Sequence, residues 1–215
     1  MRLVSVKHDF LEFPNQEAPV QLQTAISVTG PRADESWKLY ELAFDELRTT
    51  AVQRHLMSRA EFDGVLLDER VTKYFGVDDD GGYVVLATVA TDLTAMPLVS
   101  PEYFAHRWPD RYAAGQIWYV GFVAVRPDHQ RGPLFGQIVR DIGRAAAAVG
   151  GVTVMDVSRA VSTRKRMPEA LDRFFSRLAP GTRSIRLDEQ TYWAYEFPAA
   201  DAAAATPSSA RGPGR

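Results

Sequence analysis

The chain has 215 residues, of which 46% are hydrophobic and 24% are charged, the composition of an ordinary folded protein. It excludes a mainly disordered chain, a collagen-like fibre and a coiled coil. Cysteine is absent, which excludes a disulfide framework, a thiol nucleophile and a zinc–thiolate cluster. The longest apolar run, 117–125, is far shorter than the roughly 20 residues of a membrane-spanning helix, and the N-terminus lacks the apolar core of a secretory signal. We therefore expect a cytoplasmic protein without a membrane segment.

Charge is distributed unevenly along the chain. Residues 1–125 contain 11 Lys and Arg against 18 Asp and Glu, whereas residues 126–186 contain 12 Lys and Arg against 5 acids. Such a basic segment can mark the contact with an anionic partner, and a solvated basic face is the alternative. It contains no recognised nucleic-acid-binding motif, so we expect no nucleic-acid partner. The four histidines lack metal-ligand spacing, and we expect no metal site.

The apolar pattern alternates between the two-residue period of strands and the period of about 3.6 residues of helices. In chain order it predicts a strand at 20–28, helices at 34–52 and 59–67, a hairpin of strands 71–77 and 83–90, a helical insert at 101–114, a strand at 116–125, a helix at 131–149, a strand at 152–157, a helix at 168–178 and two closing strands at 183–187 and 191–197.

This order, β-α-α-β-β-(helical insert)-β-α-β-α-β-β, predicts an α/β fold with a mixed central sheet flanked by helices. The strand at 116–125 is almost continuously apolar, as expected for a strand buried on both faces. The helix after it makes a parallel crossover to the strand at 152–157. We expect a single domain over 1–198 and a disordered tail over 199–215, where large apolar residues are almost absent.

The segment most informative about chemistry reads WYVGFVAVRPDHQRGPLFG and covers residues 118–136. A buried strand leads through a short turn into a helix whose start carries Gln130, Arg131 and Gly132. The first amides of a helix lack internal partners and lie at the positive end of its dipole, so such a start suits a phosphate group. The alternative is a tight turn that only connects the strand to the helix.

Val125-Arg-Pro-Asp-His-Gln-Arg-Gly132 resembles the signature of the GNAT superfamily of acyl-CoA N-acyltransferases, a strand ending V-x-P followed by Q/R-x-x-G-x-G/A at a helix start. The resemblance implies a GNAT-like fold with acetyl-CoA or another acyl-CoA as co-substrate. It also implies that strand 117–125 splays from strand 152–157 and that the Val123 amide faces the thioester carbonyl. Pro133 and Phe135 depart from the signature. The residues that the resemblance implies for donor binding are Val123, Val125, Gln130, Arg131, Gly132, Leu134, Phe135 and Gly136.

Attack by an amine on a thioester needs a base for the amine and a proton donor for the leaving thiolate. Tyr119 stands where many family members carry a carboxylate base, and Phe174 where many carry a tyrosine acid. Asp156 is a further candidate base if its side chain faces the cleft, and burial in an ion pair is the alternative for it. The catalytic candidates are therefore Val123, Tyr119 and Asp156.

The insert Pro101–Asp110 followed by Gly115–Trp118 resembles the acyl-homoserine lactone synthases and the long-chain N-acyl amino acid synthases, which take acyl chains from acyl carrier protein. The chain lacks the Glu and Arg of the lactone synthases' W-E-x-S-R-F stretch, so we do not expect that product. The aromatic residues of the insert and of strand 116–125 suit an apolar acceptor or acyl chain, or plain core packing.

Together these observations predict an N-acyltransferase that moves an acetyl or longer acyl group from a pantetheine thioester to an amine of a small molecule. The donor is an acyl-CoA or an acyl carrier protein, and the enzyme is a monomer or homodimer. The alternative is a non-catalytic GNAT-like module that binds a ligand or regulates a partner.

Overall fold

The computed structural model describes residues 21–51, 56–129 and 134–197. The chain separates into two units, Met1–Ser184 and Ile185–Arg215. All helices and strands of the described residues lie in the first unit. The tail expected over 199–215 and residues 130–133, where phosphate contacts are expected, lie outside the described residues.

The first unit alternates helices and strands, and most elements lie within a few residues of their expected positions. In chain order they are β1 (Gln21–Ala25), α1 (Pro31–Phe44), α2 (Leu47–Thr50), α3 (Arg59–Leu67), β2 (Val71–Val77), β3 (Tyr83–Ala90), the 3-10 turn η1 (Leu93–Ala95), α4 (Pro101–Arg107), α5 (Pro109–Ala113), β4 (Ile117–Val125), the 3-10 turn η2 (Pro127–His129), α6 (Leu134–Ala148), β5 (Val152–Met155), α7 (Arg159–Lys165) and α8 (Met167–Leu178).

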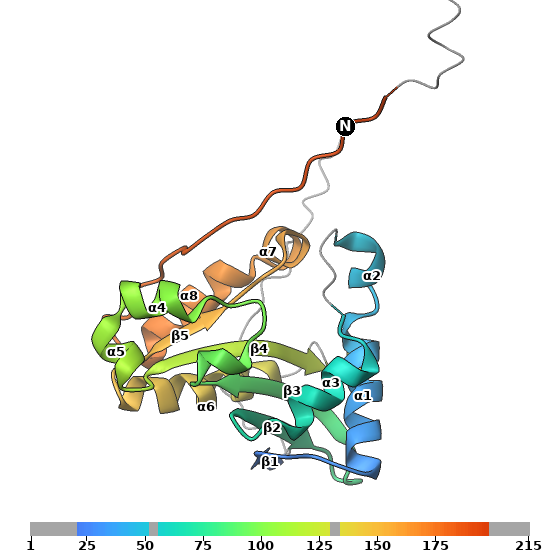
Figure 1. The fold of residues 1–215 in the computed structure, drawn as a ribbon. Coiled ribbons are helices and arrows are strands. Elements are labelled where there is room, and N and C mark those ends of the chain that lie inside the picture. Colours follow the sequence, from blue (N-terminus) through green and yellow to red (C-terminus); the bar gives the residue numbers. More distant parts are fainter. Residues whose placement is uncertain (1–20, 52–55, 130–133, 198–215) are drawn as a thin grey trace, which may run out of the picture. The chain divides into compact units, whose positions relative to one another are not determined.

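The sheet has five strands in the order β1-β2-β3-β4-β5. The first four strands are antiparallel neighbours, and β5 pairs with β4 in parallel after the crossover through α6 (Figure 1). This mixed sheet flanked by helices confirms the expected fold class.

Two apolar clusters hold helices against opposite faces of the sheet. On one face, α1 and α3 contribute Tyr40 and Phe62, which contact Phe122 of β4 with ring centroids 5.0 and 6.1 Å apart. On the other face, α6 buries residues spaced four apart, which is the repeat of one helix stripe. They pack on β3 and β4, and they are Leu134, Ile138 and Ile142. The central strand β3 is consequently buried along almost its whole length.

Two closing strands were expected at 183–187 and 191–197, and this prediction is wrong: residues 182–197 form neither helix nor strand. Alternating apolar residues make a strand only when a partner strand satisfies their backbone groups. Within the second unit, Trp193 and Phe197 are 79% and 88% exposed, so no burial stabilises an extended arrangement there.

Two helix predictions also need correction. The helix expected to run from 34 to about 52 ends at Phe44, and a separate short helix follows at Leu47–Thr50. Helix α7 was not expected. Its N-cap is Ser158, whose hydroxyl accepts a hydrogen bond from the Val161 amide at 3.3 Å, the usual way in which serine begins a helix. Among the described residues, no helix is long and apolar enough to cross a membrane.

Candidate functional site

The four residues of β5 all pair with β4, and they cover less than half of β4. The register joins Ile117 to Val152 and continues to Val120 and Met155, where β5 ends. β4 continues for five more residues, to Val125, and in the described part of the chain no strand pairs with them on the side away from β3. Within the described residues, the second half of β4 therefore has no neighbouring strand on this side.

A β-bulge lies where this opening begins. Thr88 of β3 pairs with Phe122 and the next residue, Val89, pairs with Val120, so Gly121 is the extra residue. A bulge bends the strand that contains it and shifts the alternation of its residues by one position. The bulge thus coincides with the place where β4 leaves β5.

The bulge determines which amides of β4 face the opening. The Arg126 amide donates to the Val84 carbonyl at 2.9 Å, so residues 126, 124 and 122 direct their backbone groups to β3. By the same alternation, the backbone N–H and C=O groups of Val123 and Val125 point away from β3, toward the open side. This is the direction that the GNAT resemblance implied for both residues.

Gly121 allows a close approach that no other residue type would. A Cβ atom at this position would lie 2.8 Å from the Thr88 hydroxyl oxygen and 3.7 Å from the sulfur of Met96. The Thr88 side chain is buried, so it has little room to move aside. The site therefore requires glycine on steric grounds.

Tyr119 and Asp156 meet at the edge of the opening. The Tyr119 hydroxyl donates to Oδ1 of Asp156 at 2.9 Å. Burial of the phenol raises the pKa of Tyr119, and the negative charge of Asp156 and the hydrogen bond to it raise that pKa further. Asp156 follows the last residue of β5 and is exposed, which overturns the alternative of a buried ion pair. The three catalytic candidates thus lie on β4 and directly after β5, around the point where the two strands separate.

The remaining donor-binding candidates fall into two groups. Leu134 and Gly136 are buried in the first turn of α6, and Phe135 is half-buried against the cluster that contains Val120 and Val125. Gln130, Arg131 and Gly132 lie outside the described residues. Val123, Phe135 and Met155 are all partly buried residues packed on that same cluster, so the α6 side of the opening has an apolar lining.

Sequence reasoning did not identify Gly121, Thr88 or Met96 as parts of this site. A glycine inside an otherwise apolar strand is a known sign of a bulge or of a close backbone approach, and Gly121 carried that signal. Thr88 and Met96 carried none, because their proximity to Gly121 arises only from strand register and from the turn that begins at η1. The aromatic residues Phe122 and Trp118 pack in the core clusters, as the core-packing alternative expected.

No protein-family model matches the chain, and no curated protein matches it either. Solved structures are similar in fold. An aminoglycoside acetyltransferase from an uncultured soil metagenomic sample, in complex with sisomicin, is 11% identical, with 82% of this chain and 97% of that chain covered and a TM-score of 0.48.

Two further structures are similar to the same degree. A mutant of a Bacillus halodurans protein is 14% identical, with 82% of this chain and 99% of that chain covered and a TM-score of 0.49. A ribosomal-protein-alanine N-acetyltransferase from Brucella melitensis biovar Abortus is 11% identical, with 83% of this chain and 99% of that chain covered and a TM-score of 0.45.

The fold is GNAT-like. The mixed sheet and the parallel crossover through α6, which the element order predicts, are present in the chain itself. The part of β4 that continues beyond the end of β5 contains Val123.

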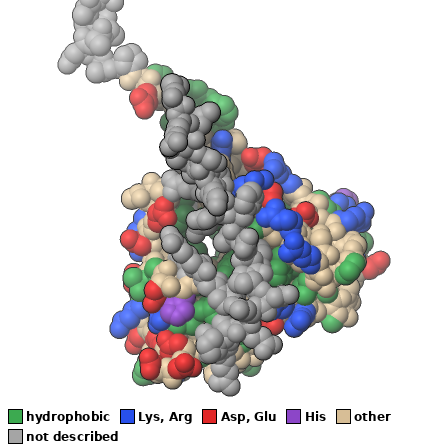
Figure 2. Space-filling model, turned by 180° about the vertical axis from the view of Figure 1, so that it is seen from behind, with side chains coloured by type: hydrophobic (Ala, Val, Ile, Leu, Met, Phe, Trp, Pro, Cys, Tyr) green, Lys and Arg blue, Asp and Glu red, His purple; other side chains and the backbone are tan. Residues whose placement is uncertain are grey.

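Helices α6 and α8 carry charged side chains of both signs. Their arginines are Arg140, Arg144, Arg173 and Arg177, and their acidic residues are Asp141, Glu169 and Asp172. Figure 2 shows Lys and Arg side chains grouped on part of the surface, with Asp and Glu side chains among them. Within the described ranges, no group of three or more His, Asp or Glu side chains is arranged to hold a metal ion.

Proposed function

We propose that the chain is a GNAT-type N-acyltransferase that moves an acetyl or longer acyl group from a pantetheine thioester to an amine of a small molecule. The observation that carries this proposal is the open edge of β4, where the bulge at Gly121 turns the Val123 backbone away from β3. An extended pantetheine arm contains two amides, and the open edge of a strand offers the donors and acceptors to pair with them.

The residues present fit such a donor in two respects. The apolar lining formed by Val123, Phe135 and Met155 suits the aliphatic parts of the arm and of an acyl chain. The start of α6, at the end of β4, suits the pyrophosphate because helix amides and the helix dipole favour anions. Leu134, Phe135 and Gly136 would contribute from the first turn of α6, and Gln130, Arg131 and Gly132 from the segment that leads to it. Val125 would lie along the pantetheine arm.

The proposed reaction assigns one role to each catalytic candidate. The amine nitrogen attacks the thioester carbonyl carbon, the carbon–sulfur bond breaks, and the sulfur leaves with the bonding electrons. The Val123 amide donates a hydrogen bond to the carbonyl oxygen, on which negative charge develops. Asp156 accepts the proton that the amine loses, and Tyr119 orients the carboxylate through the hydrogen bond of 2.9 Å. The thiolate takes a proton from solvent, because the proton of Tyr119 stays in the bond to Asp156.

Acyl carrier protein is the second donor that an observation favours. The carrier is acidic, and the arginines of α6 and α8, which we call the cationic face, number four against the three acids of these helices, Asp141, Glu169 and Asp172. Opposite charges on two proteins raise the rate at which they meet and fix their orientation. We propose that an acylated carrier would approach over this face.

Thermal stability in the presence of donors tests the proposal. The probes are CoA, acetyl-CoA, palmitoyl-CoA and palmitoylated acyl carrier protein, each at a concentration well above the expected dissociation constant. A ligand that binds only the native state raises the melting temperature. Stabilisation by a thioester supports the transferase, and release of free thiol with a panel of amines then identifies the acceptor class. No stabilisation by any of the four probes contradicts the proposal and favours the non-catalytic module.

Charge reversal on α8 distinguishes between acyl-CoA and acyl carrier protein as the donor. The double variant Arg173→Glu, Arg177→Glu should bind the acylated carrier protein more weakly. Its affinity for acetyl-CoA should be unchanged, since neither arginine belongs to the proposed pyrophosphate site. If the double variant binds both donors as the wild type does, the cationic face is not a docking surface for the carrier.

A further inference from the structure

We propose that Arg126 and Asp78 are positioning residues for donor binding: their ion pair fixes the end of β4 and the turn η2 to the β2–β3 turn. The inference rests on the proposed function, because β4 and the start of α6 form the donor site only under that proposal. Arg126 occupies the unspecified position x of the V-x-P motif, and Asp78 lies outside the motif. Asp78 lies far from it in the sequence, in the hairpin turn.

Two carboxylates hold the Arg126 side chain at the point where β4 ends. Its Nη1 donates to Oδ2 of Asp78 at 3.2 Å, and its Nε donates to Oδ1 of Asp128 at 2.9 Å. Its Nη2 lies 3.3 Å from Nδ1 of His129. The backbone is fixed as well, since the Arg126 amide donates to the Val84 carbonyl and the Arg126 carbonyl accepts from the His129 amide at 2.8 Å. One side chain thus joins the hairpin turn to η2.

Asp78 is a rigid anchor because its own turn holds it. Its Oδ1 accepts from the Gly82 amide at 2.8 Å, and its amide donates to the Gly82 carbonyl at 3.0 Å. The Gly82 amide and the Arg126 guanidinium together keep the pKa of Asp78 below its usual range. Gly81 has a φ of 80°, which glycine adopts without strain and which closes the turn. With Oδ1 used within the turn, Oδ2 faces Arg126.

The turn η2 is tied into the same network. Oδ1 of Asp128 lies 2.8 Å from Nδ1 of His129 while it also accepts from Arg126. Because η2 directly follows Val125 and Arg126, any shift of Arg126 changes the direction in which the chain leaves β4. The backbone groups of Val125, and those of the helix start beyond η2, depend on that direction.

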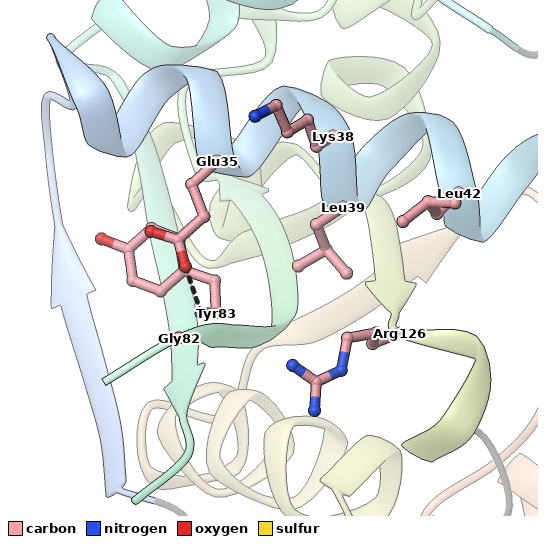
Figure 3. Close-up of a pocket in the computed structure, with 7 residues that line it drawn as sticks. All are labelled: Glu35, Lys38, Leu39, Leu42, Gly82, Tyr83 and Arg126. Carbon is pink, nitrogen blue, oxygen red and sulfur yellow. Dashed lines mark hydrogen bonds between the residues drawn. The ribbon is translucent and has the colours of Figure 1, made fainter. Parts of the chain in front are cut away.

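Packing alone does not confine the guanidinium. Arg126 borders a pocket of about 190 Å³ whose other lining includes Leu39, Leu42 and Tyr83, and Figure 3 shows its side chain across this space from α1. Its side chain is 32% exposed. A single ion pair at this exposure stabilises little, but several partners on separate segments restrict the arginine to one position. Without them the side chain has room to leave.

The experiment measures donor affinity in two variants that remove the contact from either side. Arg126→Gln removes the charge but keeps a side chain that can hydrogen-bond, and Asp78→Asn keeps the Oδ1 acceptor for Gly82. Arg32→Gln is the matched control, because Arg32 donates to the Gly81 carbonyl of the same turn at 2.8 Å and does not contact η2. Dissociation constants for acetyl-CoA and palmitoyl-CoA are determined by calorimetry, with urea unfolding to compare stabilities.

We expect each variant to bind the thioesters about tenfold more weakly, in the range by which residues outside a site change its affinity. The double variant should be no weaker than either single one, since both remove the same contact. The amides of Val125, Arg126, Asp128 and His129 should exchange hydrogen faster in both variants and not in Arg32→Gln. Conservative Arg126→Lys should recover part of the affinity, because it keeps one ion pair.

The outcomes separate this inference from the proposed function. If the wild type binds a thioester and both variants bind it within about twofold of the wild type, or as Arg32→Gln does, the positioning role is overturned and the transferase stands. If the wild type binds neither thioester, both are overturned. An equal loss of affinity in Arg32→Gln would show that the turn as a whole, rather than this ion pair, is responsible.

Discussion

The hydroxyl of Tyr119 lies 2.9 Å from Oδ1 of Asp156, across the last pairs that join β4 to β5. Because the pKa of Tyr119 is raised by burial and by the carboxylate, the phenol remains protonated at neutral pH and acts as the donor in this bond. Asp156 is thereby oriented through one oxygen at an exposed position, and Oδ2 is the oxygen that Tyr119 does not use.

We expect Asp156→Asn to lower kcat by about a hundredfold while the affinity for acetyl-CoA stays unchanged, since general-base catalysis contributes at least this factor. Tyr119→Phe should lower kcat by about tenfold, because it removes the orientation and leaves the carboxylate. The assay follows release of free CoA with a saturating amine. Asp172→Asn, an exposed carboxyl on α8, is the control. Wild-type kcat in Asp156→Asn would remove this residue from the mechanism.

Substitution of Gly121 tests whether the bulge is important for donor binding as well as for stability. A Cβ atom there would lie 2.8 Å from the buried Thr88 hydroxyl, so Gly121→Val should lower the free energy of unfolding by about 1–3 kcal/mol, the usual cost of overpacking. It should also weaken donor binding, since the Val123 amide depends on the bulge. Gly64→Ala is the control in helix α3, where a Cβ atom meets nothing within 4 Å.

The control is expected to stabilise the chain by about 0.5–1 kcal/mol, the difference between alanine and glycine inside a helix. Urea unfolding measures both changes. If Gly121→Val were as stable as the wild type and bound acetyl-CoA equally well, the backbone at the bulge would not be important for the donor site.

The strands 71–77 and 83–90 and the helix 59–67 form over the ranges that the sequence predicts. Their periodicity is clear, and both ends carry a definite breaker or cap, such as the Ser58 capping box of α3. Local information is sufficient for such elements. Local information is insufficient at 191–197. The alternating apolar residues there predict a strand, but the described chain provides no partner strand for it.

The candidate site was predictable only in part, for a related reason. Val123 follows from the motif at the end of β4, and the direction of its amide follows from strand alternation once the bulge is known. The contact between Tyr119 and Asp156 joins residues on different strands and depends on the parallel register of β4 and β5. The contact between Arg126 and Asp78 likewise depends on the tertiary structure, and no spacing of residues in the sequence predicts it.

Charge reversal at Arg131 tests the proposed pyrophosphate site directly. Arg131→Glu should weaken acetyl-CoA binding by about tenfold or more, because it places a negative charge where an anion is proposed to bind. Gly132→Val should weaken binding further if the backbone approaches the ligand closely. Calorimetry with acetyl-CoA measures both variants. Unchanged affinity in Arg131→Glu would remove Arg131 from the site, and a silent Gly132→Val would indicate a turn that only connects strand and helix.

Lys73 gives the fold a pH dependence that is unrelated to catalysis. Its side chain is fully buried in β2, and Nζ donates to the carbonyls of Ile26 and Asp68, both at 2.7 Å. Burial lowers the pKa of Lys73 from 10.5 to about 8, against the opposing effect of Asp68 and Glu69. Between these two values the unfolded chain binds more protons than the folded chain, so this group makes stability rise as pH rises through that window.

We therefore expect the wild type to gain stability relative to Lys73→Met between pH 8 and pH 10, within the window set by the pKa of Lys73. Both carbonyls keep their hydrogen bonds in the wild type, because a neutral amine still has two N–H groups to donate. Urea unfolding at several pH values measures the difference. Lys38→Met removes an exposed lysine from helix α1. Its free energy of unfolding should change with pH as that of the wild type does. A difference between wild type and Lys73→Met that stays constant from pH 7 to pH 10 would show that Lys73 titrates as an ordinary lysine.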